Sequence, residues 1–329
     1  MAKHNWLLFS LIILTAVSYI VTVAFNALSA ITNNGVFATT AGNISDRYSL
    51  DVTPAGWTFS IWSVIYIWNG AWIIYVVTTL FRRNAEGYIY VTARLHPPEF
   101  FVVWIVNNIV NIGWLFLWDQ EILIFANVFI VLLPISLYLM LAISYRNCYK
   151  YGAWMSQNNP SDLWCTRILV HNGLATYATW TSVATFLNFG IVLKYYVKIE
   201  DPNVSNIILC LIFLALVFWL MMETFVFEKY VRYTFTIYPV AIVAAVGVYT
   251  GSETSSELST VNMINVVIIG VSSFACLLRI ILLFTCHKLR PLFSEKTLNT
   301  FKEEIIGSGK KTLGIQGHIN PITIEMAES

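Results

Sequence analysis

The chain has 329 residues, of which 57% are hydrophobic and 11% are charged, and its mean hydropathy is +0.68. Nineteen basic and 18 acidic residues leave a formal net charge of +1. This composition excludes a water-soluble globule. It predicts an all-α polytopic membrane helical bundle, because lipid requires internally satisfied backbone groups and no barrel-like alternation of residues is present.

Eight apolar stretches are long enough to cross a hydrocarbon core about 30 Å thick, which needs about 20 helical residues. The predicted spans are 6–28, 57–80, 101–118, 122–145, 166–196, 206–227, 234–250 and 262–285. We expect a five-helix bundle over 1–198, three additional transmembrane helices over 199–286 and a cytosolic tail over 287–329.

The first stretch has a rival interpretation as a signal peptide, because Lys3, His4, an apolar run and the small residues 27–30 have that order. The run is longer than the usual length of about 7 to 15 residues, which favours a retained span. Cleavage would leave seven spans with an outer N-terminus, the topology of a G-protein-coupled receptor. A seven-span receptor is therefore the third functional alternative.

The basic residues predict the orientation of the chain in the membrane. With a cytosolic N-terminus, 16 of the 19 basic residues lie in inner segments, and only Arg47, Lys194 and Lys198 lie outside. Two glycosylation sequons, which start at Asn43 and Asn203, then fall on the outer side. We expect a multi-pass glycoprotein of the plasma membrane or endomembranes with both termini in the cytosol.

Three of the predicted spans each carry aromatic and amide side chains on one helical face. These residues are Trp62, Tyr66 and Gly70 in the second span, Asn107, Asn111, Trp114 and Trp118 in the third, and Tyr177, Trp180, Ala184 and Asn188 in the fifth. Any single Asn is explained as well by a hydrogen bond between packed helices. The whole set favours an enclosed pocket for a flat, mainly apolar ligand with a few polar edges.

These motifs resemble the translocator protein family, also called TspO/MBR or tryptophan-rich sensory proteins. The segments 53–57 and 62–70 look like the family's loop into its second helix, and 111–114 is similar to the third-helix Asn-x-x-Trp. Asn127 stands where the fourth helix usually has Asp. The segment 177–188 matches the fifth-helix Tyr-x-x-Trp-x-x-x-Ala-Thr-x-Leu-Asn without a gap. The resemblance covers the first five spans in order.

The resemblance implies a pocket in a five-helix bundle that binds a porphyrin, a sterol or another lipid-like molecule, as a sensor or carrier. Pro54 and Trp57 would shape a lid over it. The expected ligand-binding residues are Trp62, Tyr66, Asn107, Asn111, Trp114, Trp118, Asn127, Tyr177, Trp180, Ala184 and Asn188. Phe189 and Leu193 replace the Tyr and Arg of the family's sterol-linked motif, so that motif does not support sterol binding here.

The later spans place Glu223 and Arg279 at similar heights near the inner side, where the two charges can pair. A structural brace is the favoured interpretation of this pair. The alternative is a secondary transporter with alternating access, which would also use kinks at the mid-span residues Pro134 and Pro239. His171 could ligate a porphyrin metal or move protons, but a helix-packing histidine is the commoner case.

The remaining motifs argue against an enzyme. The five cysteines show neither metal-ligand spacing nor an outer pair for a disulfide, and no phosphate loop, hydrolytic triad or nucleic-acid module is present. We expect no bound metal and no nucleic-acid partner, and a porphyrin or lipid only as a ligand. The expected partners are membrane lipids and a hydrophobic small molecule, with a homodimer left open.

Overall fold

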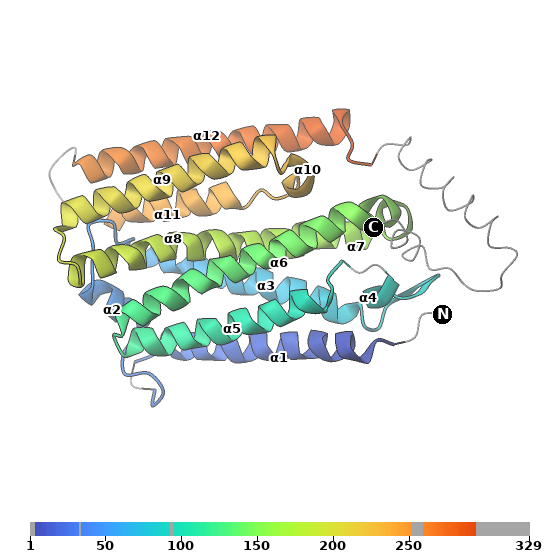
Figure 1. Cartoon of the computed structure of the whole chain (residues 1–329), viewed down its shortest axis with the longest axis horizontal. Coiled ribbons are helices and arrows are strands. Elements are labelled where there is room, and N and C mark those ends of the chain that lie inside the picture. Colours follow the sequence, from blue (N-terminus) through green and yellow to red (C-terminus); the bar gives the residue numbers. More distant parts are fainter. Residues whose placement is uncertain (1–3, 33, 93–94, 252–258, 294–329) are drawn as a thin grey trace, which may run out of the picture.

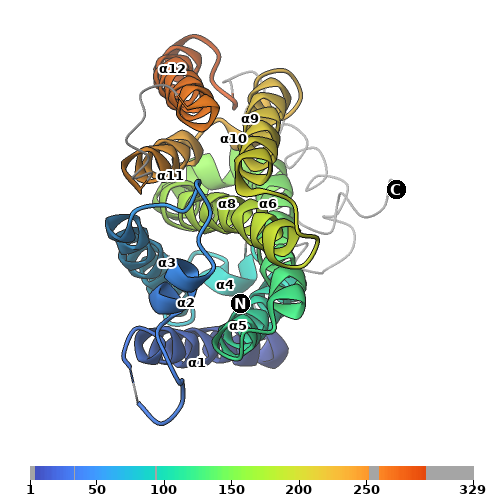
Figure 2. The same cartoon turned by 90° about the vertical axis from the view of Figure 1, so that its left-hand side faces the viewer.

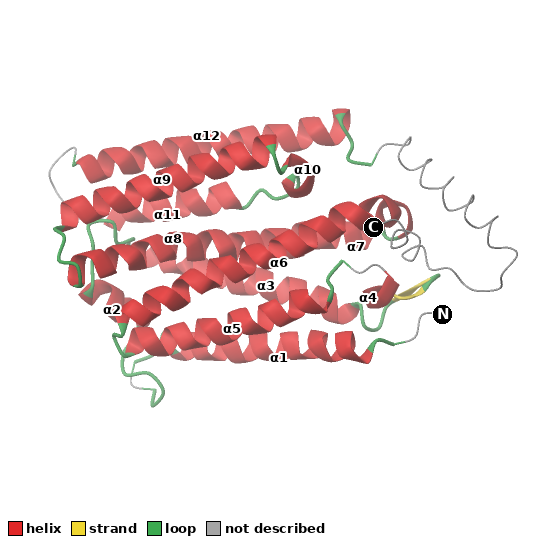
Figure 3. Cartoon of the chain, in the orientation of Figure 1, coloured by secondary structure: helices red, strands yellow, loops and turns green. Residues whose placement is uncertain are grey.

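The computed structural model describes residues 4–32, 34–92, 95–251 and 259–293. These residues are almost entirely helical, as Figure 3 shows. Their strands are β1 (Arg83–Asn84) and β2 (Gly87–Tyr88), which pair as an antiparallel hairpin. The predicted all-α membrane bundle is confirmed.

The longer helices of the described residues run side by side along the long axis of the molecule (Figure 1). They are α1 (Trp6–Leu28), α3 (Ile61–Thr78), α5 (Pro98–Asp119), α6 (Leu123–Asn158), α8 (Asn172–Tyr195), α9 (Asp201–Phe225), α11 (Ile237–Gly251) and α12 (Thr260–Leu289). Shorter elements connect them: α2 (Ala41–Arg47), the 3-10 helix η1 (Gly56–Ser60), α4 (Ile89–Thr92), α7 (Pro160–Cys165), the π-helix η2 (Thr166–His171) and α10 (Glu228–Val231).

The two ends of the bundle differ in their connections. The start of α1, the hairpin, α4, α7 and α10 lie together at one end, which we call the inner end after the predicted orientation (Figure 1). The short helix α2 and the turns from α5 to α6 and from α8 to α9 lie at the opposite, outer end. The predicted tail begins inside α12, which continues to Leu289, and its part from 294 onward lies outside the described residues.

Six of the described helices are long and apolar enough to cross a membrane by length and composition. They are α1, α5, α6, α9, α12 and α3 together with the preceding η1. The other two predicted spans are α8, which has the length but not the apolar composition, and α11, which has only 15 residues. Many of the polar residues of α8 are buried inside the bundle, among them Asn172, Thr176 and Thr181.

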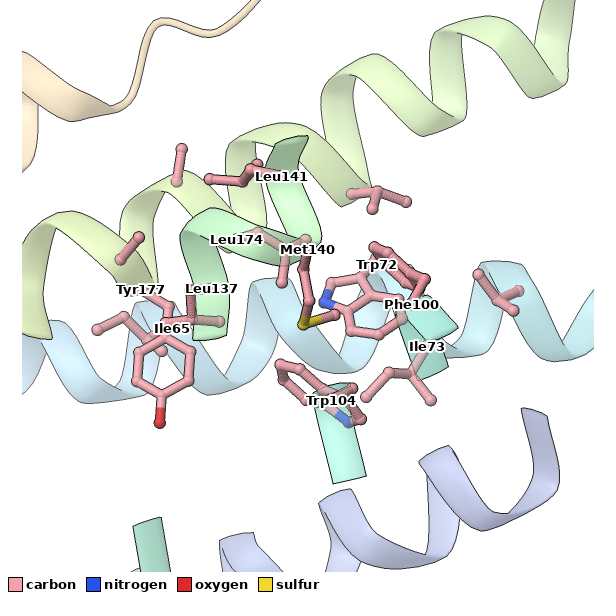
Figure 4. Packing of buried hydrophobic residues seen from close by; sticks show 14 of the residues in the cluster. Ile65, Trp72, Ile73, Phe100, Trp104, Leu137, Met140, Leu141, Leu174 and Tyr177 are labelled. Atoms are coloured by element: carbon pink, nitrogen blue, oxygen red, sulfur yellow. The ribbon is translucent and has the colours of Figure 1, made fainter. Parts of the chain in front are cut away.

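The central position of α8 explains this burial. Seen from the outer end in Figure 2, α8 lies in the middle of the molecule, with α3 and α6 on one side and α9, α11 and α12 beyond it. One hydrophobic core fills the space between α1, α3, α5, α6 and α8, and Figure 4 shows Trp72, Phe100 and Trp104 within it. A second core joins α9, α11 and α12 to the outer end.

One buried amide fastens α8 to the helices that follow. Asn172 donates from Nδ2 to the carbonyl oxygens of Tyr233 and Arg167, both at 2.9 Å, and its Oδ1 accepts from the Phe235 backbone N–H at 2.9 Å. The Thr236 hydroxyl also donates to the Asn172 carbonyl at 3.1 Å. The connection from α10 to α11 is therefore tied to the first turn of α8.

The two prolines predicted to kink the bundle have different roles. Pro134 lies inside α6, where it cannot donate to the Ile130 carbonyl, and the Thr185 hydroxyl of α8 donates to that carbonyl at 3.1 Å instead. The prediction for Pro239 was wrong, because this residue is the third of α11 and not mid-span. In the first turn of a helix the missing N–H has no intrahelical acceptor, so Pro239 needs no kink.

Candidate functional site

Four aromatic side chains from α3 and α8 form one cluster, which we call the ring cluster: Trp62, Tyr66, Tyr177 and Trp180. Trp62 is its centre. The indole stacks on Tyr66 at 5.6 Å between ring centroids and meets Tyr177 and Trp180 edge-on at 5.9 and 6.4 Å. Trp62 and Tyr66 are half-buried, whereas Tyr177 and Trp180 are buried. The predicted faces of the second and fifth spans therefore do meet.

A chain of amides links the ring cluster to α1 and α5. Asn26 Nδ2 donates to Asn111 Oδ1 at 2.7 Å and to the Thr22 carbonyl at 2.9 Å, and Asn111 Nδ2 donates to the Tyr177 hydroxyl at 3.1 Å. Asn111 is only 1% exposed. The site is thus built from four helices. Its polar edge consists of hydrogen bonds between side chains in apolar surroundings, where such bonds are strong and hold the side chains in one orientation.

The contact of α1 with α3 depends on a residue with no side chain. Tyr19 of α1 donates from its hydroxyl to the Tyr66 carbonyl at 2.5 Å. A Cβ atom on Gly70 would lie 3.1 Å from that hydroxyl oxygen, closer than an ordinary contact. Gly70, singled out in the sequence for its spacing, leaves the space that Tyr19 uses.

The other predicted residues of the third span face away from the ring cluster. Asn107 Nδ2 donates to Ser136 Oγ at 2.8 Å and to the Leu133 carbonyl at 3.2 Å, both on α6. Trp118 donates to the Ala41 carbonyl of α2 at 3.1 Å and stacks on Trp114 at 5.6 Å. Only Asn111 of the four thus has a hydrogen bond to the ring cluster.

Several of the predicted ligand-binding residues have a buried polar atom without a partner in the described part of the chain. The atoms are Asn107 Oδ1, Trp114 Nε1, Asn127 Oδ1 and Asn188 Oδ1. The other amide atom of Asn188 is occupied, since Nδ2 donates to the Ala184 carbonyl one turn earlier at 2.9 Å. Buried polar atoms are usually paired, so these four are places where water or a ligand can supply the missing hydrogen bond.

The predicted lid residues pack on α11. The indole of Trp57 is half exposed and donates to Thr250 Oγ1 at 3.0 Å, while Pro54 is buried beside Gly251. The Ala55 N–H donates to the Gly247 carbonyl at 2.9 Å. This loop reaches the ring cluster through Phe59, whose ring is 6.4 Å from Trp180.

The charged pair of the later helices is buried and fully partnered. Arg279 Nε lies 3.8 Å from Glu223 Oε2, and the guanidinium also donates to the carbonyls of Val231 and Thr234. Glu223 accepts from the Tyr238 hydroxyl at 2.5 Å and from the Trp219 indole at 3.1 Å. Both charged groups are committed to neighbours, as a structural brace requires.

His171 is held by a hydroxyl at the inner end. Its Nε2 lies 2.9 Å from Ser144 Oγ, which also lies 3.3 Å from His96 Nε2. His96 precedes α5, and burial lowers the pKa of its imidazole to about 3. It lines a cavity of about 30 Å³ together with Tyr75 and Asp162. Among the described residues no group of three potential ligands suits a metal ion.

Several important residues have no signal in the sequence motifs. Tyr19 and Asn26 are polar residues in the mainly apolar helix α1, and neither belongs to a motif with repeated spacing. Asn26 could have been found as the second polar residue of the pair Thr22 and Asn26, which are one turn apart in a span. Asn172 looks like an ordinary helix-start residue until its partners in the following connection are seen.

The aromatic and amide groups that meet between α1, α3, α5 and α8 lie inside a bundle of apolar helices, and the chain is an integral membrane protein. The sequence model described as TSPO-like protein matches residues 12–280, and the chain therefore belongs to the TSPO-like protein family. The match includes the three later helices as well as the first five. Neither the curated proteins nor the solved structures that were searched gave a match.

Proposed function

We propose that this protein binds a flat hydrophobic small molecule, a tetrapyrrole or another lipid-like compound, against the ring cluster, as a sensor or carrier. The observation that carries the proposal is the position of Trp62, which touches three other rings at centroid distances of 5.6 to 6.4 Å. Indole and phenol faces offer large apolar contact areas at a small loss of conformational freedom.

The amide chain supplies the polar part of recognition. Asn26, Asn111 and Tyr177 are linked at 2.7 and 3.1 Å beside the rings. A ligand carboxylate or carbonyl would compete for these donors. His171 is engaged with Ser144 at 2.9 Å, so ring faces and amides, not a histidine ligand, would hold a porphyrin.

Fluorescence quenching by protoporphyrin tests this proposal in mild detergent. We expect saturable quenching in the natural protein and about five- to thirtyfold weaker binding in Asn111→Val, because one buried polar contact contributes about 1 to 2 kcal/mol. The matched control is Asn108→Val, which removes a neighbouring buried amide that donates to Ser18 Oγ at 3.0 Å. Equal quenching in all three proteins would refute the proposed site.

A second pair of variants tests the rings without touching the amides. Trp62→Phe removes the central indole of the ring cluster, whereas Trp6→Phe removes an indole that is 70% exposed near the start of α1. We expect only the first change to weaken protoporphyrin binding. Loss of binding in both variants, or in neither, would count against the ring cluster.

The transporter alternative keeps its charged pair, Glu223 and Arg279, but the two prolines give it less support. The Ile130 carbonyl left free by Pro134 accepts from Thr185, and Pro239 lies in a first helical turn. The receptor alternative requires removal of α1, yet Asn26 of this helix is part of the amide chain. These contacts support a retained first span and a binding protein.

The proposed orientation can be tested at two exposed asparagines. Asn43 in α2 and Asn203 in the first turn of α9 are both exposed at the outer end (Figure 1). With both termini in the cytosol, one or both sites carry glycans in a eukaryotic secretory membrane, and treatment with an N-glycosidase lowers the apparent mass. A tag at the N-terminus that is protected from protease in intact cells would agree with a cytosolic N-terminus. A tag that protease reaches from outside would refute this topology.

A further inference from the structure

The inner end of the bundle holds a buried cation that has no carboxylate partner among the described residues. Arg167, in η2, is only 6% exposed and forms no ion pair there. Its guanidinium carbon lies instead 4.1 Å from the centroid of the Tyr233 ring and 5.0 Å from that of Trp164. Aromatic faces offset part of the cost of burying a guanidinium, but an anion offsets far more.

A second cation faces the same place from α10. Lys229 Nζ lies 5.0 Å from the ring centroids of both Tyr149 and Tyr230. A small cavity of about 10 Å³ is lined by both Arg167 and Lys229. Two positive groups that are held against rings and line the same cavity form a place where a single anion can contact both.

The nearby carboxylates are already committed to other cations. Asp162 pairs with Arg82 at 2.5 Å, Glu228 pairs with Arg232 at 2.6 Å, and Glu223 pairs with Arg279 at 3.8 Å. The net charge of the groups around this cavity is therefore positive. The cavity lies at the inner end of the bundle, where lipid headgroups or the aqueous phase are within reach.

One ring that lines the cavity comes from the segment that follows α12. It belongs to Phe293, and its centroid is 6.0 Å from the Arg167 guanidinium carbon. A Cβ atom on Gly152 would lie 2.2 Å from this ring, so Phe293 rests directly on the bare backbone of α6. The present volume suits one water molecule, and movement of the Phe293 side chain is the simplest way to admit a larger anion.

We propose that Arg167 and Lys229 form a binding site for a phosphate group, carried by a lipid headgroup or by a soluble phosphate. A guanidinium offers a planar fork of donors that matches phosphate oxygens, and an ammonium adds a mobile charge. None of these residues belongs to the ring cluster, so the phosphate site goes beyond the function proposed above and does not depend on it.

Native mass spectrometry of the full chain in mild detergent tests the site. The probes are phosphatidic acid, which carries a phosphate monoester, and phosphatidylcholine with the same acyl chains. We expect phosphatidic acid to bind the natural protein at least about tenfold more tightly, and Lys229→Gln to remove most of that difference, because one charge-assisted hydrogen bond corresponds to about tenfold or more in affinity. Arg167→Gln should remove all of it.

Lys288→Gln is the matched control, since Lys288 is exposed in the last turn of α12 and does not line the cavity. It should change the affinity for phosphatidic acid by less than about twofold, in keeping with a screened surface charge. Equal affinity in Lys229→Gln and the natural protein, or equal losses in Lys229→Gln and Lys288→Gln, would overturn the proposal. Because Lys229 is exposed, this comparison stands even where Arg167→Gln fails to fold.

Inorganic phosphate distinguishes the two sources of the group. Displacement of phosphatidic acid by millimolar phosphate in the natural protein identifies a soluble phosphate as a sufficient ligand. Retention of the lipid, with the Lys229 dependence intact, identifies a lipid headgroup. Protoporphyrin quenching should be the same in Lys229→Gln as in the natural protein, so failure of the phosphate site and failure of the ring cluster give different results.

Discussion

Removing both charges of the Glu223 and Arg279 pair should destabilise the protein less than the sum of the two single changes. The two side chains are 1% and 3% exposed, and their charged atoms are 3.8 Å apart. Breaking a buried pair on one side leaves an uncompensated charge, which costs about 3 to 5 kcal/mol. The pair thus offers a direct measure of how strongly the later helices depend on it.

The structure predicts unequal effects for the two single changes. Arg279→Met removes the ion pair and two hydrogen bonds to backbone carbonyls, so we expect about 4 kcal/mol. Glu223→Gln keeps an acceptor for the Tyr238 hydroxyl, and Arg279 keeps both carbonyls, so we expect about 2 to 3 kcal/mol. The double variant leaves no charge behind and should lose about 4 kcal/mol, which corresponds to a coupling of about 2 to 3 kcal/mol.

Thermal unfolding in mild detergent, followed by intrinsic fluorescence at one heating rate, provides the measurement. For a chain of this size 1 kcal/mol corresponds to about 2 °C, so the single variants should unfold about 8 and 5 °C earlier and the double variant about 8 °C earlier. A double variant that loses the sum of the two single effects would refute the coupling. Protoporphyrin binding should not change in Glu223→Gln, because this pair is a brace.

Three further predictions follow from other contacts. Asn172→Ala should cost about 2 to 4 kcal/mol in the same unfolding assay, since it removes three side-chain hydrogen bonds, whereas Asn265→Ala, which removes one bond to the Ala245 carbonyl, should cost about half as much. Gly247→Ala should lower the unfolding temperature by several degrees, because the new Cβ would lie 2.2 Å from Thr58 Oγ1, while Gly270→Ala has open space and should not. The folded state keeps His96 neutral, because its pKa is about 3 in the folded protein and about 6.5 in the unfolded chain. The stability of the protein should therefore fall as the pH drops from about 6.5 towards 3. Measurement of the unfolding temperature against pH should show a smaller fall in His96→Gln.

The sequence predicted the helical class and the meeting of two aromatic faces for simple physical reasons. Hydropathy reports burial in lipid, and a spacing of three or four residues places side chains on one face of a helix. Trp62, Tyr177 and Trp180 accordingly lie together. Which faces turn towards each other depends on the packing of all helices, and spacing alone did not show that Asn107 faces α6.

Positions that act through a single partner were not predictable. Tyr19 can pack against α3 because Gly70 of that helix has no side chain. Thr185 can donate to the Ile130 carbonyl because Pro134 of α6 lacks the N–H that would otherwise do so. Neither pair is near in sequence. The mid-span placement of Pro239 failed because the span predicted from hydropathy begins at residue 234, whereas α11 begins only at Ile237, after a connection that is largely buried but not helical.

The central place of α8 also bears on how the protein is made. Chains enter the membrane from the N-terminus, so α8 arrives before the connection that provides Tyr233 and Phe235 for Asn172. Because α8 is too polar to qualify as a span by itself, we expect it to enter beside a helix already present, and α6 offers the Ile130 carbonyl to Thr185. Synthesis of α9 to α12 then covers the remaining side of α8. A chain that stops near residue 198 would expose the polar residues on that side to lipid or to the cell's quality-control machinery.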